Sequence, residues 1–134
     1  MQDILERKSV HAIEAVLQLV APYDGVLKKR KINFLGDMLY IDSMRYYVFK
    51  KDNCICTCCG MKGKFFAKEK HIADKSYHLN LYGYNTDGEE VLFTKDHNIP
   101  ICKGGSSDIS NLNTMCCTCN ELKGNKMPKK QNDW

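Results

Sequence analysis

Four of the eight cysteines stand in two C-x-x-C pairs, Cys56/Cys59 and Cys116/Cys119. Two residues between cysteines allow both thiolates of one turn to reach a single ion, and two such pairs complete a tetrahedral four-sulfur site. All-sulfur tetrahedral ligation favours zinc over an iron centre. A redox role for these pairs would need a thioredoxin-like βαβ pattern nearby, which we do not find. We therefore expect a structural zinc site.

The other four cysteines are Cys54, Cys58, Cys102 and Cys117. We predict that they are small buried or half-exposed side chains. The alternative is a shifted ligand set in which Cys54, Cys58 or Cys117 replaces a neighbour. Either way the ion joins segments separated by the 56 residues from 60 to 115. Such ions bind with a free energy on the order of 10 kcal/mol, so we expect a chelator to unfold the core.

Between the cysteine pairs the sequence resembles the HNH endonuclease family, and the resemblance covers residues 53 to 127. The order and spacing of the shared motifs agree with the family. Asparagine stands where some relatives carry a final histidine, which makes this the Asp-His-Asn variant. The shared motifs are Cys56-x-x-Cys59-Gly60, Asp96-His97-x-Ile99-Pro100, Lys103-Gly104-Gly105, Asn111-Leu112, Cys116-x-x-Cys119-Asn120 and Lys123-Gly124-Asn125-Lys126.

The resemblance implies roles for four polar residues. Asp96 and Asn120 would ligate a catalytic divalent metal, magnesium or manganese. His97 would be the general base, and Asn111 would hold the loop that orients His97. Read singly, the same residues are equally compatible with a turn aspartate, a hydrogen-bonding histidine and loop or cap asparagines.

The chemistry that these roles imply is hydrolysis of a phosphodiester, which needs an activated water, neutralised charge and a stabilised leaving oxygen. A neutral histidine can accept a proton from water at cellular pH. A hard cation held by one carboxylate and one amide oxygen keeps open positions for phosphate, where it acts as a Lewis acid. The resemblance thus implies a metal-dependent endonuclease.

The basic residues favour a nucleic-acid substrate, although the net charge is only +4. The resemblance implies DNA, and RNA is the alternative. Cationic side chains gain affinity by releasing counterions from the phosphate backbone. Lysines and Arg30 cluster at 28–31, at 62–70 around Phe65-Phe66, and at 123–130. By the resemblance, three lysines are expected to contact phosphates, namely Lys103, Lys123 and Lys126.

The elements expected around these residues are mainly extended. Two strands over 76–96 flank Asn85-Thr86-Asp87-Gly88, in which Asp-Gly is a strong hairpin signal. A loop over 99–111 contains Gly104-Gly105, and a short strand is expected over 112–116. A helix of about two turns should begin near Thr118 and end near Gly124.

The preceding residues predict an amphipathic helix over 3–21, closed by Pro22, and one or two strands over 38–50. We expect an α+β fold with three parts. Residues 1–50 form a helical and strand extension, 51–127 form a zinc-stabilised ββα-metal (HNH) core, and 128–134 form a basic tail. The segment between Cys59 and Asp96 is longer than compact versions of the motif need.

Neither a membrane span nor a signal peptide is recognisable, so we expect a cytoplasmic protein in a bacterium or a phage-infected host. One active site cuts one strand, so a double-strand cut needs a homodimer or two events. The 3–21 helix is the expected dimer contact, and a larger phage or restriction complex is the other assembly considered. The alternative function is a non-catalytic zinc module that binds nucleic acid or a protein partner.

Overall fold

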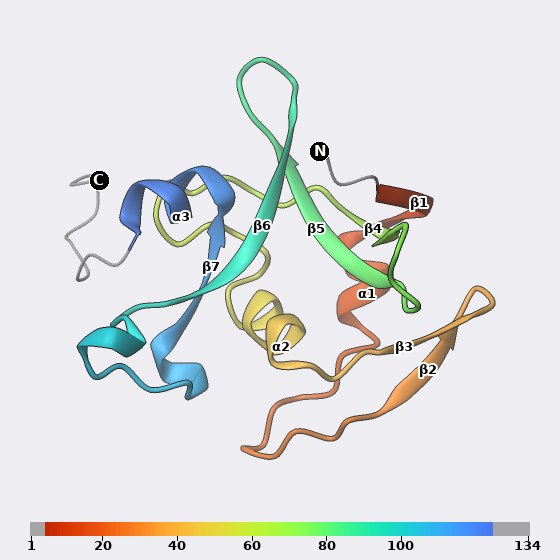
Figure 1. Ribbon diagram of the computed structural model, residues 1–134, viewed down its shortest axis with the longest axis horizontal. Helices are drawn as coiled ribbons and strands as arrows, with labels where there is room; N and C mark the ends of the chain where they lie inside the picture. Colours follow the sequence, from red (N-terminus) through yellow and green to blue (C-terminus); the bar gives the residue numbers. More distant parts are fainter. Residues whose placement is uncertain (1–4, 125–134) are drawn as a thin grey trace.

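The computed structural model describes residues 5–124, which form a mixed fold of strands and short helices (Figure 1). Five antiparallel strands make the main sheet in the order β1-β4-β5-β6-β7. They are β1 (Leu5–Ala12), β4 (Phe65–His71), β5 (His78–Tyr84), β6 (Glu90–His97) and β7 (Leu112–Cys116).

The other elements lie before β4 or beside the last strands. A separate two-stranded hairpin consists of β2 (Lys31–Phe34) and β3 (Asp37–Tyr40). The α-helices are α1 (Ile13–Leu17), α2 (Met44–Lys51) and α3 (Cys117–Lys123), and the 3-10 turns are η1 (Ile101–Lys103) and η2 (Ile109–Asn111). Within residues 5–124 we find no helix whose length and apolar character would let it cross a membrane.

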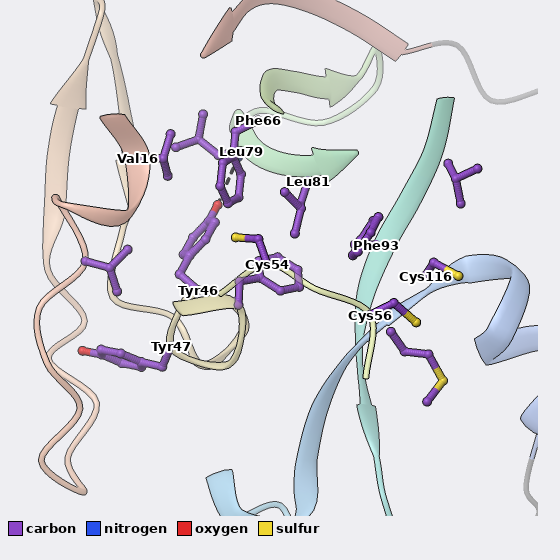
Figure 2. Packing of buried hydrophobic residues seen from close by; sticks show 14 of the residues in the cluster. Val16, Tyr46, Tyr47, Cys54, Cys56, Phe66, Leu79, Leu81, Phe93 and Cys116 are labelled. Atoms are coloured by element: carbon purple, nitrogen blue, oxygen red, sulfur yellow. Dashed lines mark hydrogen bonds between the residues drawn. The ribbon is translucent and has the colours of Figure 1, made fainter. Parts of the chain in front are cut away.

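The core lies between one face of the sheet and the first two helices (Figure 2). Side chains alternate across a strand, so Phe66, Leu79 and Leu81 point to the same face. They pack against Val16 of α1 and Tyr46 of α2, and all five are at most 2% exposed. Helix α2 is therefore fixed by the core against the strands.

The predicted hairpin is confirmed as β5 and β6. The Asn85 side-chain Oδ1 accepts from the backbone amides of Asp87 and Glu89, and Gly88 has a φ of +77°. Local turn chemistry therefore closes the hairpin. The predicted strand over 112–116 and the helix after it are confirmed as β7 and α3.

The prediction of a helix over 3–21 is wrong for residues 5–12, which form strand β1, and α1 covers only Ile13–Leu17. Few of these residues are apolar, and Val10 is 54% exposed, so a helix here would have little apolar surface to bury. As a strand the segment pairs with β4, and Arg7 forms ion pairs with Glu69 and Glu90. Tertiary contacts outweigh a weak helical pattern.

The prediction of strands over 38–50 is correct for β3 and wrong for Met44–Lys51, which form α2. Tyr46, Tyr47, Val48 and Phe49 are consecutive and all buried. Aromatic and β-branched residues favour strands because they suit a half-buried pleated surface. A short helix enclosed by the core buries the same residues on all sides, and their type alone does not distinguish the two cases.

Lys68 joins the β2–β3 hairpin to the main sheet. Its ammonium is buried and donates to the Phe34 and Leu35 carbonyls at 2.9 and 3.1 Å and to Asp37 Oδ2 at 2.6 Å. The expectation that Lys68 belongs to a phosphate-binding cluster is therefore wrong, because its three donors are used inside the fold.

Candidate metal centre and hydrolytic pocket

Four cysteines are positioned to bind one metal ion. Cys56 and Cys59 lie in the turn after α2, Cys116 ends β7, and Cys119 lies in α3. The four Sγ atoms are within 4.8 Å of one another, and Cys59 Sγ is 3.8 Å from Cys116 Sγ. Zinc–sulfur bonds of about 2.3 Å in a tetrahedron place sulfurs about 3.8 Å apart, so the residues fit that ion.

Backbone geometry shapes the first cysteine turn. The Cys59 amide lies 3.5 Å from Cys56 Sγ, and the Gly60 amide donates to the Cys56 carbonyl at 2.9 Å. The φ of Gly60 is +80°, a conformation that glycine adopts without strain. Cys54 is not in this cluster, and burial raises the pKa of its thiol to about 12. It behaves as a small buried side chain, as predicted.

Asp96 and His97 are the last two residues of β6, where they pair with Asn113 and Leu112 of β7. His97 is partly exposed, and its Nε2 lies 3.3 Å from Ser107 Oγ in the following loop. Adjacent strand residues point to opposite sides, so Asp96 faces α3 while His97 faces the loop. The strand end thus carries a carboxylate directed toward α3 and an imidazole directed toward the loop.

Asn111 holds the loop that follows His97. Its Oδ1 accepts from the Ile99 amide at 2.9 Å, and its Nδ2 donates to the carbonyls of Ile99 and Ser106 at 3.1 and 2.7 Å. Its backbone carbonyl accepts from the Asn98 amide at 2.7 Å. One amide side chain therefore fixes both ends of the loop over 99–106.

Lys123 connects α3 to the end of β6 and is only 2% exposed. Its Nζ donates to the His97 carbonyl and lies 2.8 Å from Asp96 Oδ2. That second contact is an ion pair without hydrogen-bond alignment, so Oδ2 has no hydrogen-bond partner among the described residues. The Lys123 ammonium is therefore the cation that compensates the buried Asp96 carboxylate in this structure.

Asp96, His97 and Lys123 line a pocket of about 230 Å³. Its wall also includes Cys102, which is exposed and which the sequence motifs did not single out. A larger hollow of about 520 Å³ lies at the start of α2, so size alone does not identify the chemical site. The smaller pocket is the one that gathers the titratable side chains expected from the sequence.

A comparison with known families matches residues 85–133 to a model described as HNH endonuclease. Residues 85–133 are thus similar to the HNH endonuclease family. The matched segment includes β6, the loop held by Asn111, β7 and α3. No curated protein and no solved structure matches the chain significantly.

Two of the remaining predicted residues of the HNH segment, Asn120 and Lys103, lie in the described part of the chain. Asn120 lies in α3 and is partly exposed, but it does not line the pocket with Asp96. Lys103 is exposed at the end of η1. Lys126 and the tail over 128–134 lie outside the described residues. The structure therefore brings together Asp96, His97 and Lys123, whereas Asn120 is not among the residues that line their pocket.

Steric crowding explains why the second residue of the Gly104-Gly105 motif is a glycine. A Cβ on Gly105 would lie 1.7 Å from the Ile99 carbonyl oxygen and 3.0 Å from Asn111 Nδ2. The backbone therefore approaches so closely that only glycine fits, and the Asn111 hydrogen bonds depend on that approach.

We predict that Gly105→Ala displaces the loop beside His97 and lowers the cleavage rate about 100-fold, as expected for a shift on the order of 1 Å near a reacting group. Single-turnover cleavage measures the effect. Gly88→Ala in the β5–β6 turn is the matched control, because its φ of +77° is strained for alanine but its Cβ meets no atom within 4 Å. Equal losses of rate in both variants would show a general stability effect instead.

Proposed function

We propose that the protein is a metal-dependent DNA endonuclease that hydrolyses phosphodiester bonds. The observation that carries the proposal is the shared pocket of Asp96 and His97 at the end of β6, inside a segment similar to the HNH endonuclease family. In this reading β6, β7 and α3 form the ββα-metal core. The four-cysteine cluster holds structural zinc and ties the turn after α2 to that core.

His97 would act as the general base. Its imidazole is partly exposed at the pocket, where a water can approach it. A neutral imidazole nitrogen accepts the proton of that water as the water attacks phosphorus. Asn111 supports this step indirectly, because its hydrogen bonds fix the loop that carries Ser107, the neighbour of His97 Nε2.

Asp96 and Asn120 would hold the catalytic magnesium or manganese ion. Bound there, the ion would neutralise charge on the phosphate and stabilise the leaving oxygen. Asp96 supplies the buried oxygen described above, and Lys123 orients that carboxylate from α3. Lys123 therefore acts on the site through Asp96, whereas exposed Lys103 is available for a direct phosphate contact.

The division into 1–50, 51–127 and 128–134 stays a prediction, as do a cytoplasmic location and assembly as a homodimer or in a larger phage or restriction complex. The proposed dimer contact loses its basis, because residues 5–12 form a strand in place of the expected helix. Strand β1 also completes the main sheet, so residues 5–12 are joined through β4 to the strands of the nuclease segment.

Removing the Lys123 charge should destabilise the protein. Lys123→Met leaves a largely buried Asp96 carboxylate without its cation, and we expect a loss of about 3 kcal/mol in the free energy of unfolding. Urea unfolding measures it. The double variant Lys123→Met/Asp96→Asn should lose less than the two single losses added together, because it removes both charges. If the double variant lost the full sum of the two single losses in unfolding free energy, Lys123 and Asp96 would not be energetically coupled.

The proposed function is tested with a labelled duplex oligonucleotide and zinc-loaded protein, with magnesium, with manganese and with no added divalent ion. We expect cleavage only with an added ion, leaving 5′-phosphate ends on the products. Tight binding without cleavage under any condition, by folded zinc-bound protein, would favour the non-catalytic binding module instead.

A further inference from the structure

A groove outside the hydrolytic pocket runs along the β2–β3 hairpin. It joins the hollow of about 520 Å³ at the start of α2 to a second hollow of about 270 Å³. Tyr40 and His78 line both hollows, so the two are neighbours, and we call the pair the hairpin groove. The proposed hydrolysis at His97 makes no use of it.

The charge of the hairpin groove is unbalanced. Lys29 lines the first hollow and Lys31 and Lys75 line the second, and none of the three forms an ion pair within residues 5–124. The carboxylates of Asp42 and Asp37 are already bonded to cations of the fold, at 2.8 and 2.6 Å. An anionic partner would therefore meet free ammonium groups and no free carboxylate on these walls.

The floor of the hairpin groove is apolar and aromatic. Tyr40 is 52% exposed, Met38 54% and Leu27 41%, although large apolar side chains usually avoid water. The Lys31 ammonium lies 4.9 Å from the centre of the Tyr40 ring. The ammonium lies over one face of this half-exposed ring and leaves the other face for a base to stack on. An aromatic ring with cationic side chains around it is the combination that binds single-stranded nucleic acid. A duplex keeps its bases stacked inside and offers no base face to such a ring.

The groove and the hydrolytic pocket lie on two sides of α2. Ser43, Met44 and Arg45 at the start of α2 line the groove, and the same helix packs against β7 and η2, which contains Asn111 (Figure 1). The two sites are therefore separate, and a DNA substrate that reaches both must pass around α2, whose residues 46–49 are buried.

We propose that the hairpin groove binds a single-stranded stretch of the DNA substrate, with a base on Tyr40 and phosphates on Lys29, Lys31 and Lys75. The assignment of DNA rests on the proposed endonuclease function. It adds a substrate class, namely DNA in which a single-stranded stretch adjoins the cut site.

Binding is measured by fluorescence anisotropy with a labelled single-stranded oligonucleotide of mixed sequence. The protein carries His97→Ala, so that no cleavage interferes. Tyr40→Ala should weaken binding about tenfold or more, as expected for the loss of one stacked base. Lys29→Gln/Lys31→Gln should lower the slope of log affinity against log salt by about 1.4, or about 0.7 for each lost phosphate contact.

The control is Lys51→Gln at the end of α2, which removes an exposed lysine that lines neither hollow and belongs to none of the three basic clusters. It should leave binding and slope nearly unchanged. Unchanged binding in the groove variants, or an equal loss in the control, would overturn the proposal.

If Tyr40→Ala does not fold, Tyr40→Leu replaces it. Leucine keeps the apolar contact but cannot stack on a base, so this variant should also bind the oligonucleotide more weakly. A duplex with a single-stranded overhang that binds wild type but is not cut with any divalent ion overturns the nuclease function and not the groove.

Discussion

Replacing Cys116 by serine should prevent zinc binding and unfold the segment that carries the hydrolytic pocket. Structural zinc contributes on the order of 10 kcal/mol, comparable with the 5–15 kcal/mol total stability of an ordinary domain. Cys116 also lies at the junction of β7 and α3, so its loss releases both elements from the turn after α2. A site with only three of its four cysteines would therefore not hold β7 and α3 in place, and Asp96 would not stay beside Lys123.

Zinc content per chain and thermal unfolding followed by circular dichroism measure this effect. Cys102→Ser is the matched control, because Cys102 is exposed and outside the four-cysteine cluster. The control should keep one zinc per chain and the wild-type unfolding temperature. A Cys116→Ser protein that still bound zinc stoichiometrically and unfolded like the wild type would show that the cluster is not the structural site.

Replacing His97 by alanine should lower the rate of the chemical step by a factor of about 10² to 10⁴, the range expected for loss of a general base. Binding should change little, since His97 is partly exposed and its side chain is hydrogen-bonded within residues 5–124 to Ser107 alone. The rate constant comes from single-turnover cleavage, and the affinity from anisotropy in the same buffer.

His71→Ala is the control for this experiment, because His71 is exposed at the end of β4, away from the pocket residues. It should cleave like the wild type. A His97→Ala rate equal to that of His71→Ala would remove His97 from the chemistry and leave the pocket without a base.

The sequence predicted best the parts of the fold that depend on local chemistry. The Asn85 and Gly88 turn and the C-x-x-C spacing each bring partners together over a few residues, and these features were located correctly. Strand β1 and helix α2 could not be predicted in this way. Their conformations depend on distant partners, such as Glu69 for Arg7, that no local pattern contains.

The candidate site shows the same difference between features set by local sequence and features set by contacts between distant residues. The adjacent Asp96 and His97 could be singled out from the sequence, but their contact with buried Lys123 depends on how α3 packs against β6. The reason for Gly105 is likewise a close approach to Ile99 that only the folded loop contains. The hairpin groove combines residues from 27 to 78, and no single motif marks it.

The most direct test of the central claim is cleavage of supercoiled plasmid by zinc-loaded wild type and His97→Ala, with magnesium and with a chelator added just before the assay. The endonuclease assignment predicts nicked or linear DNA from the wild type with magnesium only. Equal product from His97→Ala or in the chelator lane, or no product from folded zinc-bound wild type in any lane, would contradict it.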